Sequence, residues 1–333
     1  MRQKSSPLPA RIEVIEYQLP DNIETGITLI EQNPEWSIVE IEKKTGINTR
    51  YISDQHETAL DLGFRAANKI LVNNENLRVE IDVLIFVTQS PDYALPASAC
   101  ILQEKLNLKT NCMAFDVNQG CSGFIYGMAL SSSLITAGLA NKVLLVCADT
   151  YSKYIAPDDR TCRPIFSDGA AATLISSSIE PQIGPFELGT DGKGALNLIV
   201  ENGGARQRSR GAIQDQKLFM DGAKVFMFSM SAVPKCVENL LHKTNKSLSD
   251  IDLFVFHQAS KLVLDNIIRH LSLPAERVYC NYSRVGNTVS ASIPIALKDA
   301  LDDGVLKHGD LVMVVGFGVG YSWGASLLRW GAK

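Results

Sequence analysis

Short, uninterrupted runs of apolar residues recur along this chain and alternate with segments of helical character. The clearest runs are VLIFV at 83–87, KVLLVCA at 142–148 and LFVF at 253–256. A strand that is apolar at every position has no polar face, so it belongs in a sheet that is covered on both sides. Such strands alternating with helices predict an α/β fold.

Segments of the first half recur in the second half in the same order. IDVLIFVTQS at 81–90 is similar to IDLFVFHQAS at 251–260, an offset of 170 residues. NKVLLVCADT at 141–150 is similar to GDLVMVVGFG at 309–318, an offset of 168 residues. Matches in one order at nearly one offset indicate an internal duplication.

The segment between these pairs follows the same rule. CSGFIYGMALSSSLITAG at 121–138 corresponds to SASIPIALKDALDDG at 290–304, an offset of 169 residues. We therefore predict two halves, 1–180 and 181–333, each built as α-β-α-β-α and related by a pseudo-twofold axis. The boundary is placed in the segment 178–190, which is rich in turn-forming residues.

Composition and charge restrict the possible functions. The chain has 333 residues, 46% of them hydrophobic and 20% charged, with a formal net charge of −4. This balance argues against general binding to nucleic acid or to an anionic membrane, which needs a basic excess. The first 20 residues contain no apolar core of a secretion signal, and the apolar segment 124–140 is too short to span a bilayer. That segment is predicted to be a fully buried helix.

The seven cysteines are scattered, and none forms a C-x-x-C pair. We therefore expect no metal site, no disulfide framework and a reducing, cytoplasmic location. Cys121 stands out because it follows an apolar strand, precedes an apolar helix and is flanked by Gly120 and Gly123. At the first turn of a helix, unpaired N–H groups and the helix dipole stabilise a thiolate. Taken alone, Cys121 is either such a nucleophile or a buried core thiol.

Two polar residues of the second half complete a possible catalytic set. His257 directly follows the apolar strand LFVF, at the carboxyl end where α/β folds place functional groups. Asn287, in RVGNTVSAS, lies a few residues before the position that corresponds to Cys121. Under a pseudo-twofold axis, Cys121 and Asn287 approach each other. The glycine-rich segment GFGVGYSWGASL at 316–327 lacks the lysine of a phosphate-binding loop, and we expect it to direct backbone N–H groups toward an oxyanion.

Taken together, these segments resemble β-ketoacyl-acyl carrier protein synthase III, a condensing enzyme with the thiolase fold. The similarity extends from about residue 10 to residue 331. It is carried by EWSIVEIEKKTGINTRYI, LPASACILQEKL, DVNQGCSGFIYG, PDDRTCRPIFSDGAAATLI, MDGAKVFMFSM, FHQAS, RVGNTVSASIPIAL and GFGVGYSWGASLL. The resemblance implies an acyltransferase in which Cys121 carries the acyl group and His257 and Asn287 complete a triad.

The resemblance also implies the reaction. Cys121 takes an acyl group from acyl-CoA, and the backbone N–H groups of Cys121 and Val319 hold the oxyanion. A malonyl group on acyl carrier protein loses carbon dioxide while His257 and Asn287 donate hydrogen bonds, and the resulting carbanion attacks the acyl-cysteine. No cofactor is implied. The product is a β-ketoacyl thioester for fatty acid biosynthesis.

Further roles follow from the resemblance. Trp36, Lys44 and Arg160 would surround the adenine and phosphate end of CoA, with Lys44 where the family usually has arginine. Phe166 would line the acyl pocket. Leu95 stands where the family often has a phenylalanine that reaches into the partner subunit of a homodimer, whose interface would include the strand near 112–118.

Several residues depart from the family pattern. FSDGAAA replaces F-G-D-G-A-G-A, and Ser260 replaces an asparagine that supports the histidine, so we expect a less rigid imidazole. These changes suggest an enzyme specialised for a secondary metabolite or a surface glycan. The acidic carrier protein would need a cationic patch. The candidates are Arg206, Arg208, Arg210, Lys261 and Arg269.

Other functions stay open from the sequence. A thiolase would carry a second cysteine in the glycine-rich loop, and an elongating condensing enzyme would carry a second histidine in place of Asn287. Acyltransferases that form an ester, an amide or a polyketide or quinolone-type product from CoA thioesters would load Cys121 identically. A catalytically silent acyl-CoA-binding subunit and a Cys-His-Asn peptidase are the alternatives of other classes.

Overall fold

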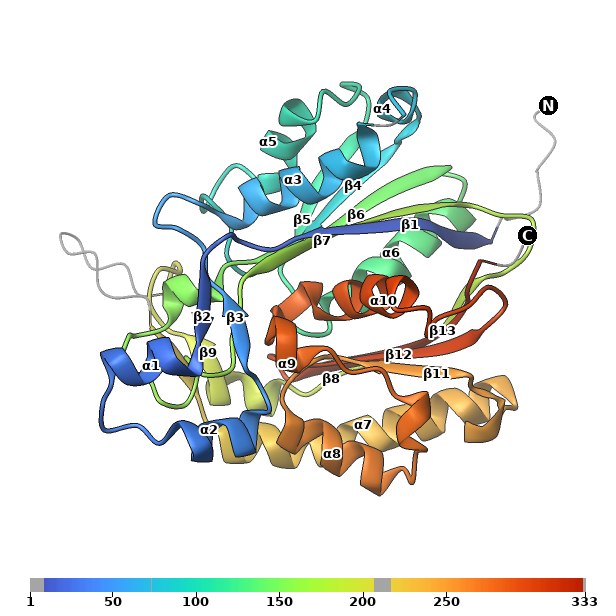
Figure 1. Ribbon diagram of the computed structural model, residues 1–333. Coiled ribbons are helices and arrows are strands. Elements are labelled where there is room, and N and C mark those ends of the chain that lie inside the picture. The colour runs from blue at the N-terminus through green and yellow to red at the C-terminus, as the bar shows by residue number, and fades with distance from the viewer. Residues whose placement is uncertain (1–8, 73, 207–216, 332–333) are drawn as a thin grey trace, which may run out of the picture.

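The computed structural model describes residues 9–72, 74–206 and 217–331, which fold into alternating layers of helices and sheets (Figure 1). The first sheet has five strands in the order β1-β7-β6-β4-β5, and the second has four in the order β11-β12-β13-β8. Helices lie between the two sheets, and further helices cover the outer face of each sheet. This is the layered α/β arrangement that the apolar strands predict.

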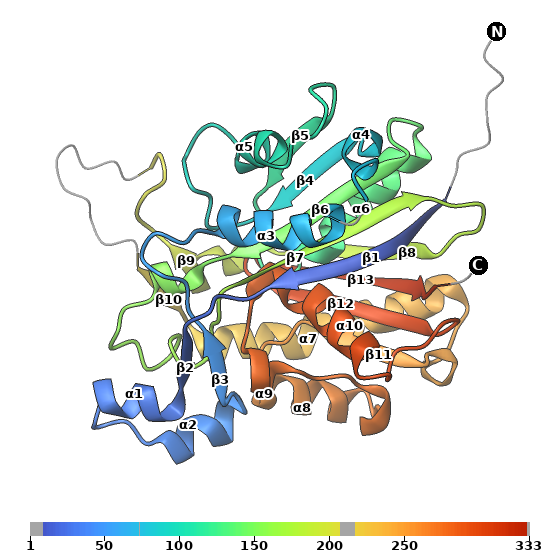
Figure 2. The ribbon, with the colours of Figure 1, turned by 45° about the horizontal axis from the view of Figure 1, so that its top comes forward.

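The strands of the first sheet all come from the N-terminal half, and they lie side by side in Figure 2. β4 pairs in parallel with both β5 and β6, whereas β7 is antiparallel to its neighbours β6 and β1. The bounds are β1 Ala10–Gln18, β4 Val83–Val87, β5 Met113–Val117, β6 Lys142–Asp149 and β7 Gly169–Ser177.

The second sheet repeats this pairing pattern. β11 and β12 are parallel, and β13 is antiparallel to both β12 and β8. The counterpart of β5 is reduced to one isolated parallel bridge between Phe254 and Val278. The matching topology explains the sequence repeat at one offset. The bounds are β8 Ile183–Thr190, β11 Leu253–Phe256, β12 Leu311–Gly318 and β13 Ser322–Arg329.

The expected boundary segment needs a correction. The position 180/181 falls between β7 and β8, but most of the segment 178–190 is strand β8 and not a linker. The prediction relied on turn-forming residues, but Gly184, Pro185 and Gly189 all lie inside β8. This strand is at the edge of its sheet and pairs only with β13 within that sheet. An edge position tolerates such residues since one side of the strand makes no ladder bonds.

Three cores explain why the strands have no polar face. Val83, Ile85 and Val87 of β4 contact the middle layer, whereas Leu84 and Phe86 pack under the outer helices. A third core lies between the second sheet and its outer helices, around residues such as Phe254 and Phe256. In β4, the alternation places each residue against apolar side chains on one face or the other.

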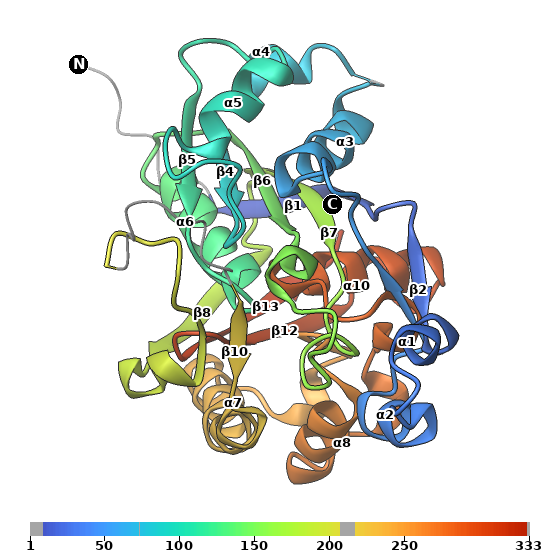
Figure 3. The same cartoon turned by 90° about the vertical axis from the view of Figure 1, so that its left-hand side faces the viewer.

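The helices divide among these layers. The middle layer contains α6 Gly123–Thr136 and α10 Ser292–Asp302, while α3 Ala59–Leu71, α4 Leu77–Glu80 and α5 Ser98–Lys105 cover the first sheet. α7 Gly222–Thr244 and α8 Lys261–His270 cover the second sheet, and α8 lies beside α2 Ile38–Thr45 (Figure 3). The remaining elements are α1 Gly26–Gln32, α9 Tyr282–Val285, β2 Ile23–Thr25, β3 Thr49–Tyr51, β9 Leu198–Val200, β10 Leu218–Met220, η1 Tyr151–Tyr154, η2 Gly192–Asn197, η3 Leu248–Asp250, η4 Ala275–Arg277 and η5 Val289–Ala291.

The helix α6 is not fully buried, contrary to the prediction. Phe124, Ile125 and Met128 are fully enclosed, but Leu130 is 39% exposed and Ser133 is also open to solvent. The exposed face of α6 cannot be recognised from the sequence, because small and apolar residues occupy both faces of the helix. No helix among residues 9–72, 74–206 and 217–331 is both long enough and apolar enough to cross a bilayer.

Candidate active site

Cys121 lies in the turn that joins β5 to α6, at the end of a cavity of about 750 Å³. Its side chain is only 5% exposed. Gly318, the last residue of β12, lies beside Cys121 and leaves no room for a side chain. A Cβ atom added to Gly318 would lie 2.8 Å from the Cβ and 3.0 Å from the Sγ of Cys121. The glycine-rich segment therefore passes directly against the sulfur, as expected.

The backbone N–H groups of Cys121 and Val319 both lower the pKa of the Cys121 thiol. Burial, together with the negative charge of Asp149, has the larger effect and raises the pKa of Cys121 to about 12. The prediction of a stabilised thiolate is therefore wrong for the unliganded protein. Desolvation of the charged form exceeds the effect of the helix terminus, and Cys121 is a neutral thiol at pH 7.

A cluster of buried hydroxyl groups fixes the segment around Val319. The Oγ atoms of Ser122 and Ser322 are 2.7 Å apart, and Ser322 donates to the carbonyl oxygen of Val319 at 2.7 Å. The Oε1 of Gln119 is an alternative acceptor for these hydroxyls, 3.4 Å from that of Ser122 and 3.2 Å from that of Ser322. The two N–H groups beside the sulfur are thus held in one rigid arrangement.

His257 directly follows β11, where the sequence predicted it, and lines the same cavity. Its Nδ1 is 2.7 Å from the Oγ of Ser292, and its ring meets Phe317 edge to face with centroids 5.6 Å apart. Burial lowers the pKa of His257 to about 3, so the imidazole is neutral at pH 7. A neutral ring has one donor nitrogen and one acceptor nitrogen.

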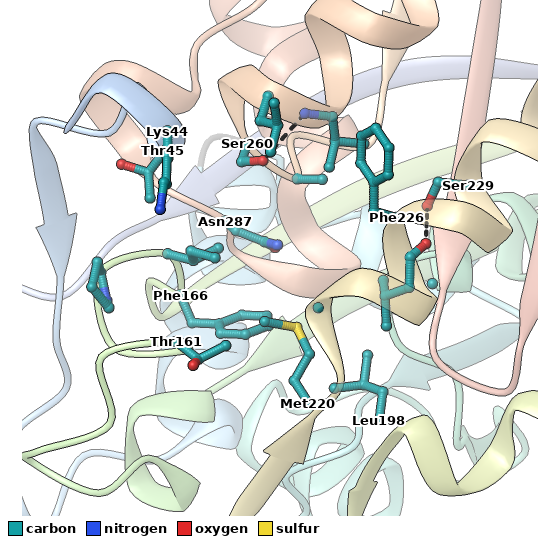
Figure 4. A pocket seen from close by; sticks show the side chains of 18 of the residues that line it. Lys44, Thr45, Thr161, Phe166, Leu198, Met220, Phe226, Ser229, Ser260 and Asn287 are labelled. Carbon is teal, nitrogen blue, oxygen red and sulfur yellow. Dashed lines mark hydrogen bonds between the residues drawn. The ribbon is translucent and has the colours of Figure 1, made fainter. Parts of the chain in front are cut away.

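Asn287 is held by backbone hydrogen bonds on both sides. Its N–H donates to the carbonyl of Ile165 at 3.0 Å, and its carbonyl accepts from the N–H of Ser167 at 2.9 Å. Its side-chain Oδ1 accepts the N–H of Val289 at 2.9 Å. The Nδ2 group therefore remains available, and Figure 4 shows it directed into the cavity.

The structure brings Cys121, His257 and Asn287 together, since all three line one cavity. They come from the ends of different elements in both halves, as the pseudo-twofold arrangement predicts. Apolar side chains form much of the remaining wall. They are Ile165, Phe166, Leu198, Met220, Val225, Phe226 and Phe317. Phe166 is 4% exposed and therefore lines the apolar part, as the sequence suggests.

The cavity opens where charged, solvent-exposed residues line it, near side chains of α2, α7 and α8, and this part is its mouth. Lys44 and Arg160 both line it and are exposed to solvent. Arg160 lies 3.3 Å from Glu40 in an exposed ion pair. Trp36 is placed differently from the expectation, because it is 7% exposed and packs with Leu29 and Ile41 in a separate small core. Ile41 lines the cavity, so Trp36 lies behind the wall.

Ser260 also has a different role from the expected one. It lines the cavity, but its hydroxyl caps α8 by accepting the N–H of Val263 at 3.4 Å. The imidazole of His257 is supported by Ser292 instead. The sequence carried no signal for this contact, because Ser292 lies 35 residues away on α10.

The remaining predicted residues lie on the surface. Leu95 is 81% exposed. Lys261 and Arg269 are exposed on α8, where Lys261 contacts Asp265 at 2.5 Å. Arg206 is also exposed, whereas Arg208 and Arg210 lie outside the described residues. Across the described ranges, no three His, Cys, Asp or Glu side chains are grouped as a metal site requires.

Comparisons with known proteins agree with this geometry. Family models described as 3-oxoacyl-(acyl-carrier-protein) synthase III and its C-terminal part match residues 115–192 and 241–330. The beta-ketoacyl-(acyl-carrier-protein) synthase III of Clostridium perfringens is 36% identical over 303 residues, which cover 90% of this chain and 92% of that protein. The chain belongs to the 3-oxoacyl-(acyl-carrier-protein) synthase III family.

Solved structures of this family have the same fold. A crystal structure of a 3-oxoacyl-(acyl-carrier-protein) synthase III superimposes with a TM-score of 0.93 and 40% identity, covering 97% of this chain and all of that one. The synthase III of Pseudomonas aeruginosa PAO1 gives a TM-score of 0.89 and 33% identity, with 97% and 99% coverage. The predictions of the family and of the thiolase-like fold are confirmed.

Synthase III chemistry fits the groups in this cavity. A thiol can form an acyl thioester, a neutral imidazole can transfer a proton, and an amide can donate to a carbonyl oxygen. The apolar walls exclude water from that thioester. No local pattern pointed to the supporting residues Ser122, Ser292 and Ser322 or to the buried Asp149.

Proposed function

We propose that this protein catalyses the decarboxylative condensation of an acyl-CoA with malonyl-acyl carrier protein through an acyl-cysteine intermediate. The observation that carries the proposal is that Cys121, His257 and Asn287 line one buried cavity, with two backbone N–H groups at the sulfur. The family supports the same reaction, because its relatives are named for that activity.

The first half-reaction loads Cys121. Because the thiol is neutral at pH 7, its proton has to leave as the sulfur attacks the thioester carbonyl, and the neutral imidazole of His257 is suited to accept it. The N–H groups of Cys121 and Val319 stabilise the tetrahedral oxyanion. When that intermediate collapses, the bond to the CoA sulfur breaks, and His257 returns the proton to the leaving thiolate.

The second half-reaction generates the carbon nucleophile. The carbonyl oxygen of the malonyl thioester accepts hydrogen bonds from His257 and Asn287, the bond to the carboxylate breaks, and carbon dioxide leaves an enolate. The enolate carbon attacks the acyl-cysteine carbonyl, the bond to the Cys121 sulfur breaks as the β-ketoacyl product forms, and the departing thiolate takes up a proton from water. Since decarboxylation supplies the electron pair, no strong base is needed.

Ser292 allows His257 to act in both steps. The loading step needs an acceptor at Nε2, and the decarboxylation step needs a donor there. A hydroxyl can accept from Nδ1–H or donate to unprotonated Nδ1, so the 2.7 Å contact with Ser292 is compatible with either tautomer.

The cavity mouth supports the substrate assignment. Lys44 and Arg160 provide positive charge for the phosphates of CoA, while Phe166, Leu198 and Met220 offer an apolar surface for the acyl chain. The exposed Arg206, Lys261 and Arg269 are proposed to bind the acidic carrier protein. We also propose a homodimer through the edge strand β5 and the exposed Leu95. The seven unpaired cysteines fit the expected cytoplasmic location.

A condensation assay tests the proposal. Wild-type protein with acyl-CoA and malonyl-acyl carrier protein should release carbon dioxide and form a β-ketoacyl product. Asn287→Ala and His257→Ala should each still fold but lose decarboxylation. If the wild type instead transfers its acyl group to an alcohol or amine without releasing carbon dioxide, the condensation proposal is wrong. Specialisation for a secondary metabolite stays a prediction, which a panel of acyl-CoAs of different length and branching would test.

A further inference from the structure

Asp149 is a fully buried carboxylate to which the condensation reaction assigns no role. It is the last residue of β6 and is 0% exposed. Its Oδ1 accepts the N–H of Gln89 at 2.8 Å and the hydroxyl of Thr88 at 3.4 Å, both directly after β4. Its Oδ2 accepts the hydroxyl of Ser290 at 2.5 Å and the N–H of Ser290 at 3.3 Å. One carboxylate thus joins the two halves of the protein.

All four of these donors are neutral. None of the ion pairs found within the described part of the chain includes Asp149. Burying a carboxylate without a cation is unfavourable, and a neutral side chain of the same shape avoids this cost. Burial raises the pKa of Asp149 to about 7, although the hydrogen bond from Ser290 lowers it, so the carboxyl group is partly ionised at pH 7 and charged at higher pH. A role other than packing is therefore expected for this group.

One side of Asp149 restrains the turn that carries Asn287. Between Asn287 and Ser290 lies Val289, whose φ of +53° is rare for a β-branched residue and needs support from its surroundings. The N–H of Val289 binds the Asn287 Oδ1, so the conformation of this turn sets the direction of the amide. Asp149 holds the far end of the turn through Ser290.

The other side of Asp149 influences the nucleophile. Its negative charge raises the pKa of Cys121, because a second negative charge nearby is unfavourable. Gln89, which binds Asp149 through its N–H, also packs against the residue before the nucleophile: a Cβ atom on Gly120 would lie 2.5 Å from the Gln89 Oε1. The Asp149 charge raises the pKa of four thiol and phenol groups, all of which are uncharged at pH 7. They are Cys121, Cys147, Tyr151 and Tyr154.

We propose that Asp149 is a positioning residue: through Ser290 it orients the Asn287 amide for decarboxylation, and in its ionised form its charge adds to the effect of burial in disfavouring the Cys121 thiolate. The part concerning Asn287 rests on the proposed function. The part concerning Cys121 does not.

The first experiment needs no activity. Wild type and Asp149→Asn are treated with iodoacetamide at a series of pH values, and alkylation of Cys121 is followed by peptide mass spectrometry. Removing the charge should shift the alkylation midpoint to lower pH. A shift of about one unit gives about ten times more thiolate at pH 8, and the lower basicity reduces its reactivity by about threefold, so a net gain of about threefold is expected.

The second experiment measures release of carbon dioxide from malonyl-acyl carrier protein. Asp149→Asn and Ser290→Ala should both lose about tenfold or more, because each frees the turn that orients Asn287. Ser290→Ala keeps the carboxylate, so its alkylation midpoint should not move to lower pH. Destabilisation alone could also expose the buried thiol and speed its alkylation, so Asp149→Asn is compared with variants of similar melting temperature that keep the carboxyl group.

Asp299→Asn is the matched control. Asp299 is 6% exposed and binds Tyr17, Asn281 and Arg284, and it is not a cause of the Cys121 pKa shift. It should change neither readout, and thermal melting confirms that each variant is folded. The inference would be overturned if Asp149→Asn releases carbon dioxide at the wild-type rate and has the wild-type pH midpoint of alkylation. It would also be overturned if Asp299→Asn changes both readouts as much as Asp149→Asn does. A wild type without any decarboxylation would contradict the proposed function, while the alkylation arm would still decide the effect of Asp149 on Cys121.

Discussion

Replacing Gly318 with alanine tests how closely the glycine-rich segment must approach the nucleophile. The added methyl group would lie 2.8 Å from the Cys121 Cβ and 3.0 Å from its Sγ. Carbon atoms in contact are ordinarily about 3.5–4.0 Å apart, so the overlap is about 0.7 Å. The sulfur can rotate away, but the Cβ is fixed by the turn between β5 and α6. The backbone of one segment therefore has to move.

That movement has a predictable size and a direct readout. Overpacking of this kind costs about 1–3 kcal/mol, which should lower the melting temperature by a few degrees. A displacement of this order in the Val319 N–H relative to Cys121 should slow acylation by about 100-fold. Mass spectrometry of the acyl-protein at short times after adding acyl-CoA measures this rate.

The control is Gly192→Ala, because a Cβ atom there meets nothing within 4 Å. It should acylate and melt like the wild type. If Gly318→Ala also acylates at the wild-type rate, the close approach of β12 is not required, and the assignment of the Val319 N–H to the oxyanion site loses its structural basis.

Three further predictions concern the same site. Ser322→Ala removes the hydroxyl that binds the Val319 carbonyl and should slow acylation about tenfold, with a smaller effect on malonyl decarboxylation. Ser322→Thr should restore the acylation rate, and an equal loss of both activities in Ser322→Ala would contradict this prediction. The imidazole of His257, with its pKa lowered to about 3, should show no NMR titration between pH 5 and 8, with the signal assigned by His257→Gln; a midpoint near 6.5 would disprove its desolvation. Since the pKa of Cys121 is raised to about 12, its alkylation rate should keep rising above pH 9; a plateau below pH 9 would show that the thiol is not perturbed in this direction.

Much of the fold could be predicted because the strands are buried on both sides. Val83–Val87 and Leu253–Phe256 are apolar at each position for that reason, and the repeat made the pairing pattern visible twice. His257 could be found because it interrupts the similarity at the end of an apolar strand. β8 was misjudged because glycine and proline at an edge strand look like a turn.

The site was predicted only in part, because some of its properties depend on contacts between distant residues. The pKa of Cys121 follows from its burial and from Asp149, which lies 28 positions away in the printed sequence. The support of His257 comes from Ser292 on α10 and not from the nearby Ser260. Trp36 is covered by Ile41, which the local sequence does not reveal. Local patterns identify candidate residues, whereas burial and long-range hydrogen bonds determine their chemistry.

The most direct test of the central claim is intact-protein mass spectrometry after incubation with acyl-CoAs. One acyl adduct is expected on the wild type, located on Cys121 by peptide mapping and absent from Cys121→Ser. An unmodified wild type, or an adduct that persists in folded Cys121→Ser, would contradict the assignment of Cys121 as the acyl-carrying nucleophile.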